Sequence, residues 1–259
     1  MLVQTVTVPG SLGNSPGGSA TNVTFAADDI EVALDIEVIV SVAQGANVVV
    51  YFAPWTEQGW ADALSQIAND TAHDPSVLSI SWGWPELDAA LAWEWTPQTV
   101  SFVSIQFTML AAFGTTVLVC SGDTGTDCGV NDGRAHVLYP ASDPGVIECG
   151  GTRLALDPFF EQTWNDPAIP PEATGGGVSD LISPPSFQAG ANVPASVNGN
   201  GRLGRGVPDV AGNASPLSGY YLWLYGQSTQ TLTLTSGSHQ GVRLARRGAP
   251  ARWRPSMLP

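Results

Sequence analysis

Three continuous apolar runs constrain the fold of this chain more than any other feature of its sequence. They are residues 47–53, 77–82 and 115–121. Each predicts a buried strand, because a strand covered on both faces lacks the alternation of polar and apolar residues seen at a sheet surface. A short fourth strand is expected at residues 145–149. Helical stretches separate these runs, so the sequence predicts right-handed βαβ units and a parallel sheet.

The stretches between the apolar runs have the spacing of helices. In residues 29–42, apolar side chains recur at positions 30, 33, 34, 38 and 41, which is one face of a helix. Residues 59–69 also suit a helix, and residues 87–113 suit one or two helices with a break at Pro97. The fold class predicted from the residues is therefore α/β.

Composition excludes several classes of function. The chain of 259 residues carries 9 basic residues against 23 acidic ones, and its net charge of −14 argues against a nucleic-acid surface. No run of 18 apolar residues predicts a membrane span, and the first residues lack the basic and apolar regions of a signal peptide. Three cysteines cannot build a disulfide framework.

The charge is distributed unevenly along the chain. Residues 241–259 hold five of the nine Arg and no acidic residue, so residues 1–240 hold all 23 acids. We expect one partial catalytic domain at 1–240 and a basic tail at 241–259 that is disordered or out of frame. Within the domain, residues 155–218 are expected to be mostly irregular, and a hairpin is expected at 220–225 and 229–235. An excess of carboxylates suits an acidic medium, although solubility alone explains it equally well.

Polar or aromatic residues follow each of the three buried runs, where an α/β sheet places its functional site. Asp123 lies in such a loop, as an active-site carboxyl or as a turn residue that caps its own backbone. Glu31 and Asp35 are four apart, so they share one helix face with Cβ atoms about 5–6 Å apart. Their alternative role is a solvated acidic face near a helix N-terminus, where the helix dipole favours carboxylates.

Other chemistries find less support. His136 with Cys120, Cys128 and Cys149 matches no common zinc spacing, and we expect no metal site in these residues. A glycosidase with two carboxylates is disfavoured, because residues four apart on one helix cannot flank a sugar bond from opposite faces.

A series of longer motifs resembles the sedolisin family of serine-carboxyl peptidases, most closely its kumamolisin type, over about residues 29–226. In chain order the motifs are EVALDIEV (31–38), VYFAP (50–54), SISWGWPE (79–86), SGDTG (121–125), YPASDP (139–144), CGGTRL (149–154), TGGGVS (174–179) and RGVPDVAGNA (205–214). The resemblance implies a subtilisin-like parallel sheet with helices on both faces, incomplete here at both ends. It also implies a Ser-Glu-Asp triad and acidic endopeptidase or tripeptidyl-peptidase activity.

The resemblance assigns roles to the candidate carboxylates. Glu31 matches the general base, Asp35 its orienting partner and Asp123 the oxyanion-hole residue. Near pH 4 a His would be protonated, whereas the reference pKa of Glu is about 4.3. Asp123 can donate to an oxyanion only when protonated. We therefore expect its pKa to be raised, by neighbouring carboxylates and by partial burial.

Substrate and localisation are also implied by the resemblance. Ser81, Trp82 and Gly83 match the strand edge on which such enzymes bind a peptide by β-pairing. The expected partner is a peptide or protein substrate, without nucleic acid or membrane, and the chain is expected to be a monomer. The resemblance also implies a secreted protein.

The match weakens at the C-terminus. Ser236 lies within about a residue of the expected nucleophile, but the Gly-Gly that precedes it in the family is missing. One hypothesis is that the sequence from roughly residue 228–244 onward is out of frame. No cofactor is expected in this chain, since the family's calcium site would lie beyond its C-terminus. The alternative to an impaired peptidase is an inactive peptide-binding relative or a truncated fragment.

Overall fold

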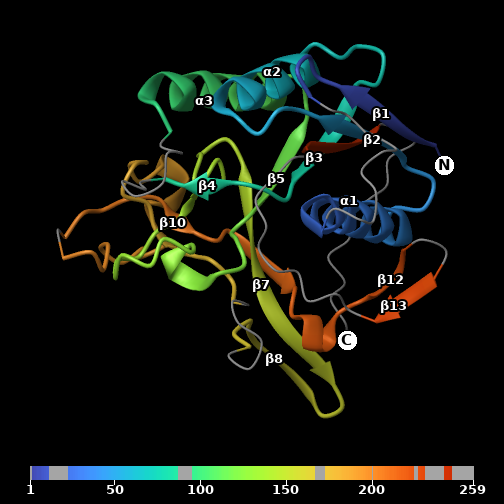
Figure 1. Cartoon of the computed structure of the whole chain (residues 1–259). Coiled ribbons are helices and arrows are strands. Elements are labelled where there is room, and N and C mark those ends of the chain that lie inside the picture. Colours follow the sequence, from blue (N-terminus) through green and yellow to red (C-terminus); the bar gives the residue numbers. More distant parts are fainter. Residues whose placement is uncertain are drawn as a thin grey trace.

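An eight-stranded sheet forms the centre of the molecule (Figure 1). The computed structural model describes residues 2–11, 23–86, 95–166, 173–199, 201–224, 227–230 and 242–246, with backbone alone for 23–30, 223–224, 227–230 and 242–246. The strands of the sheet are β1 (Val3–Thr7), β2 (Asn47–Phe52), β3 (Pro75–Ile80), β5 (Thr116–Cys120), β7 (Ile147–Leu156), β8 (Phe159–Thr163), β11 (Val210–Asn213) and β14 (Val242–Arg246).

Three helices and several small elements complete the described fold. The helices are α1 (Val23–Val42), α2 (Glu57–Ala68) and α3 (Pro97–Ala112). The two-stranded pairs are β4 (Trp84–Pro85) with β6 (Leu138–Tyr139), β9 (Gly177–Val178) with β10 (Gly206–Val207), and β12 (Tyr221–Leu224) with β13 (Gln227–Gln230). Short 3-10 turns are η1 (Gly125–Asp127), η2 (Ser186–Gln188) and η3 (Pro216–Ser218). None of the described helices is long and apolar enough to cross a membrane.

The predicted apolar strands are confirmed, with ends that differ by one or two residues. The order across the sheet is β1-β2-β14-β3-β5-β7-β11, and β3, β5, β7 and β11 pair in parallel. The α2 helix buries Trp60, Ala63, Leu64 and Ile67, which follow the i, i+3, i+4, i+7 spacing of one helix face. These side chains pack in one apolar core with residues of β2, β3 and β5.

Pro97 begins a helix instead of breaking one. The α3 helix starts at this residue, and the side chain of Thr96 caps it by accepting the backbone N–H of Thr99 at 3.3 Å. Proline is favoured at the first helical position because its missing N–H would have no partner there. The earlier part of the predicted helical stretch, residues 87–94, lies outside the described residues.

The hand of the first crossover differs from the expected right-handed one. The chain moves across the sheet in one direction from β1 to β2, from β2 to β3 and from β3 to β5. Uniformly right-handed connections would place all three helices on one face. The α1 helix instead lies on the face opposite α2 and α3 (Figure 1), so β1–α1–β2 has the opposite hand to the next two connections. This crossover brings α1 to the ends of β3 and β5.

A hairpin was missed in the region expected to be irregular. The strand predicted at 145–149 continues as β7 to Leu156, and β8 returns antiparallel to it after a turn at Asp157-Pro158. All five residues of β8 are exposed, so its sequence carries no apolar pattern that would have predicted a strand.

The β14 strand fills the position between β2 and β3. It pairs antiparallel with both neighbours, with Leu244 opposite Val49 on one side and Leu78 on the other. These five residues belong to the 241–259 tail that we expected to be disordered or out of frame, and in the structure they form a strand. The domain boundary at 240 and the out-of-frame hypothesis stay predictions.

Candidate active site

The carboxyl ends of β3 and β5 lie side by side, because Ile80 and Val119 are partners in a parallel ladder. Ser81 and Ser121, which follow these strands, therefore lie at the same edge of the sheet. The Ser81 hydroxyl donates a hydrogen bond to Asp35 Oδ2 at 2.6 Å. This contact places the half-buried Asp35 of α1 at the strand ends.

Glu31 precedes Asp35 by about one turn of α1, and its charge acts on the same region. Burial raises the pKa of the Cys120 thiol well above its usual value, and the negative charges of Asp123 and Glu31 raise it further. Because such effects weaken with distance, Cys120, Glu31 and Asp123 lie in one neighbourhood. Asp35 thus lies at the edge of the sheet that carries Asp123, with Glu31 about one turn before it on α1. The roles expected of the three carboxylates stay predictions. Cys120 was missed as a member of this group, since a cysteine ending a buried strand resembles any core residue.

The loop of Asp123 is held by a segment that runs beside it. The Ala173 N–H donates to the Asp123 carbonyl, and the Gly175 N–H donates to the Gly122 carbonyl, both at 2.9 Å. A Cβ atom on Gly175 would lie 1.9 Å from the Ser121 carbonyl oxygen, so only glycine fits there. Gly122 itself has a φ of 97°. The backbone on both sides of Asp123 is therefore fixed.

Burial raises the pKa of the Asp123 carboxyl, and the expected direction is confirmed. The physical reason differs in part from the expected one: loss of hydration is the cause, and repulsion by neighbouring carboxylates is not. A carboxyl with a raised pKa keeps its proton to a higher pH than an exposed aspartate. In that protonated form it can donate a hydrogen bond to an acceptor that enters the site.

Of the residues expected to bind peptide, Trp82 contributes a buried side chain, 7% exposed. Gly83 lies tightly against β6, where a Cβ atom would come 3.0 Å from the Tyr139 carbonyl oxygen. A peptide pairing with this segment would therefore use the backbone of 81–83 and not the indole of Trp82.

A cluster of aromatic rings supports the strand ends and was missed in the sequence. Its members are Trp55, Trp60, Trp84, Trp95 and Tyr139, with ring centroids 4.7 Å apart for Trp84 and Trp95 and 4.9 Å apart for Trp55 and Trp84. Edge and tilted contacts of this kind add to the stability gained by burial. The cluster joins the segment after β2, helix α2 and strands β4 and β6.

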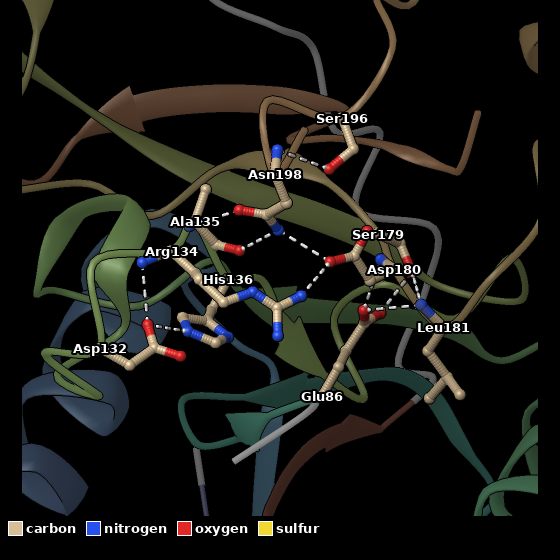
Figure 2. Close-up of polar contacts among 10 residues, drawn as sticks. All are labelled: Glu86, Asp132, Arg134, Ala135, His136, Ser179, Asp180, Leu181, Ser196 and Asn198. Atoms are coloured by element: carbon tan, nitrogen blue, oxygen red, sulfur yellow. Dashed lines mark hydrogen bonds and ion pairs between the residues drawn. The ribbon is translucent and has the colours of Figure 1, made fainter. Parts of the chain in front are cut away.

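Glu86 is buried at the end of β4 and binds a distant turn. Its carboxylate accepts the Ser179 hydroxyl at 2.5 Å and the backbone N–H groups of Asp180 and Leu181 at 3.1 Å (Figure 2). Burial raises the pKa of the Glu86 carboxyl, and these hydrogen bonds oppose that rise.

The loop that follows Asp123 is joined to the same turn. Asn198 exchanges two hydrogen bonds with the backbone of Ala135, at 2.7 and 2.8 Å, and donates to Asp180 Oδ2 at 2.7 Å (Figure 2). Arg134 contacts Asp180 at 3.2 Å, and His136 Nε2 lies 2.9 Å from Asp132. His136 thus lies in a network that holds loops together, which is the simplest account of this histidine.

Ser236 lies outside the described residues, so its distance to Glu31 is not defined. Among the described residues, no three His, Cys, Asp or Glu side chains come together in a way that could hold a metal ion. The calcium site expected beyond the C-terminus stays an expectation, and no step of the chemistry below depends on a metal.

Comparison with known proteins agrees with this architecture. No family model matches the chain. It is 44% identical over 230 residues to kumamolisin from Bacillus sp. (strain MN-32), covering 88% of this chain and 39% of that protein. It is 35% identical to sedolisin from Pseudomonas sp. (strain 101), covering 76% of this chain and 34% of that protein. It is 29% identical to tripeptidyl-peptidase 1 from Homo sapiens, covering 78% of this chain and 37% of that protein.

A solved structure shares the fold. It is Pseudomonas sedolisin, a serine-carboxyl proteinase complexed with two molecules of pseudo-iodotyrostatin, with a TM-score of 0.65 and 27% identity over 90% of this chain and 63% of that chain. The shared fold and the sequence relatives place the chain in the class of serine-carboxyl peptidases. The chain belongs to the sedolisin family and is kumamolisin-like. It spans about 39% of the length of that kumamolisin.

Proposed function

We propose that this chain carries the acid–base part of a peptidase site that works at acidic pH and hydrolyses peptide bonds. One observation supports the proposal: Asp35 of α1 accepts the Ser81 hydroxyl just after β3, at the sheet edge where the half-buried Asp123 follows β5. Carboxylates can act as bases at a pH where a histidine is already protonated.

In the proposed reaction, Glu31 accepts the proton of a serine hydroxyl while the serine oxygen attacks the peptide carbonyl carbon. The protonated Asp123 donates a hydrogen bond to the oxyanion that forms. Glu31 then gives its proton to the leaving amine, and water repeats the sequence on the acyl-enzyme. Asp35 orients Glu31, and the backbone of Ser81, Trp82 and Gly83 binds the substrate.

Ser236 is the candidate nucleophile, and the Gly-Gly that precedes the serine in the family is missing before it. A nucleophile misplaced by about 1 Å can lose on the order of 100-fold in rate. We therefore expect little cleavage by the chain as written. The missing Gly-Gly before Ser236 also favours the second candidate function, which is peptide binding without hydrolysis.

The test measures cleavage and binding together. The purified chain, Glu31→Gln and Ser236→Ala are assayed on a denatured protein at pH 4, and binding of a substrate peptide is measured by calorimetry. Cleavage lost in both variants would make Ser236 the nucleophile, since removal of a general base costs about 100- to 10,000-fold. Binding without cleavage supports the peptide-binding alternative. Cleavage that neither substitution affects, or a chain that neither binds nor cleaves, would overturn the proposal.

A further inference from the structure

We infer that the Ser81 hydroxyl is a positioning group that holds Asp35 in its orienting role, and so couples the peptide-binding segment to the carboxylate pair. The inference rests on the proposed function and deepens it. It assigns to the Ser81 side chain a task separate from the backbone pairing proposed for residues 81–83.

The geometry of the contact is that of a hydrogen bond to a charged acceptor. The distance of 2.6 Å between Ser81 Oγ and Asp35 Oδ2 falls in the range of about 2.5–2.7 Å for a hydroxyl that donates to a carboxylate. A hydroxyl has one proton to donate, and Ser81 gives it to Asp35. The bond joins two elements 46 residues apart in the chain.

The sheet holds the backbone of Ser81 in place, and Asp35 gains a fixed partner that its own helix does not provide. Ser81 directly follows β3, which is paired on both sides, with β5 and with β14. The next residue, Trp82, is buried, and Gly83 lies against the Tyr139 carbonyl. The Ser81 hydroxyl therefore projects from a backbone with little freedom, and a short bond to it limits the rotamers that Asp35 can adopt.

The consequence is chemical as well as structural. A hydrogen bond to the ionised form of a carboxylate favours that form, so the Ser81 hydroxyl should favour the charged form of Asp35. A charged Asp35 one turn away raises the proton affinity of Glu31, which is what a general base requires. The Cys120 thiol feels the charge of Glu31, and it also feels the charges of Asp123 and Glu148. A peptide that pairs with the backbone of 81–83 would contact Ser81, the residue whose hydroxyl binds Asp35.

The inference predicts two opposite shifts on removal of the hydroxyl. In Ser81→Ala, Asp35 loses a partner of its charged form, so its pKa should rise by about one unit, the size expected for one charge-assisted hydrogen bond. Asp35 is then neutral over more of the acidic range. The pKa of Glu31 should fall, because the neighbouring negative charge is lost. A role in packing alone would not produce this pair of shifts.

The experiment is a carboxyl NMR titration of Asp35 and Glu31 in the full chain, for the parent and four variants. Ser81→Ala and Ser81→Cys should both show the two shifts, and Ser81→Cys keeps the side-chain volume if alanine disturbs the fold. Ser81→Thr retains a hydroxyl and should restore the parent values. Ser76→Ala, at a half-buried serine within β3, should leave the pKa values of both carboxyls unchanged.

The outcomes separate this inference from the proposed function. If Asp35 titrates in Ser81→Ala and Ser81→Cys as it does in the parent, the positioning role is refuted, whatever the peptidase assay shows. If Ser76→Ala produces the same shifts, the effect is general and the role is also refuted. If the two shifts appear while no variant cleaves or binds peptide, the positioning role stands and the proposed function fails.

Discussion

Replacing Arg205, which forms an ion pair with Asp209, should destabilise the fold more than replacing an arginine of an exposed ion pair. This side chain is fully buried. Its guanidinium donates to both carboxylate oxygens of Asp209, at 2.7 and 3.0 Å, and to the backbone carbonyls of Asp143, Val146 and Gly206 at 3.2–3.3 Å. Arg205→Met keeps an apolar stem of similar length and removes all five donors.

The size of the loss follows from the groups left behind. Removing one partner of a fully buried ion pair costs about 3–5 kcal/mol. The side chain of Asp209 is 22% exposed, so we expect a loss near the lower end of that range. Glu148 adds to the cost, because it is fully buried and neither of its carboxyl oxygens has a hydrogen-bond partner among the described residues. The positive charge of Arg205 stabilises the ionised form of Glu148, and this stabilisation is lost in the variant. Total stabilities are about 5–15 kcal/mol, so a loss of about 3 kcal/mol should remove a fifth or more.

Urea unfolding, followed by circular dichroism, measures this difference. The matched control is Arg134→Met, whose half-exposed arginine pairs with Asp180 at 3.2 Å and should cost about 0–1 kcal/mol. In Arg205→Met/Asp209→Asn the double loss should be smaller than the sum of the single losses, by about 0.5–3 kcal/mol. If Arg205→Met loses no more free energy of unfolding than Arg134→Met, the pair of Arg205 with Asp209 does not stabilise the fold as predicted.

Three further predictions concern the site and its pH dependence. Gly175→Ala should cost about 1–3 kcal/mol in thermal unfolding and loosen the Asp123 loop, because the new methyl group would overlap the Ser121 carbonyl; an unchanged Tm would refute this. The free energy of unfolding should rise as the pH falls toward 4.5, because the raised pKa of Glu148 means that the folded chain binds a proton there more tightly than the unfolded chain. Below pH 3.8 it should fall, because Asp209, whose pKa is lowered in the folded chain, becomes protonated. A free energy that changes in one direction only over this pH range would contradict the prediction. Any cleavage activity should extend to higher pH in Asp123→Asn, whose amide donates without a titrating proton, and an unmoved alkaline limb would argue against the oxyanion role.

The sequence predicted the parts of the fold in which apolar residues face the core. Residues 47–53 and 77–82 became β2 and β3 because uniform burial leaves a continuous apolar run. The exposed β8 has no such pattern and was missed. The crossover hand was also predicted wrongly, because it depends on which face α1 covers, and hydrophobic spacing does not encode that choice.

The candidate site was predictable to a similar extent. The spacing of Glu31 and Asp35 indicated a shared face, and the position of Asp123 after a buried strand indicated a place near them. The contact between Ser81 and Asp35 joins residues 46 apart in sequence, and only the fold, which brings α1 to the end of β3, reveals it. The cause of the raised pKa of Asp123 likewise depends on burial, which a short loop motif does not specify.

The position of β14 has a consequence for the order in which the protein is made. Among the described strands, β1 and β2 are joined to β3, β5, β7 and β11 through β14, which comes last in the chain. Until residues 242–246 leave the ribosome, the sheet is in two parts, and β2 and β3 each have an edge of unpaired N–H and C=O groups where β14 will pair. Such edges pair readily with strands of other chains. Synthesis at high concentration should therefore favour exchange of β14 between copies, giving swapped dimers of otherwise native subunits.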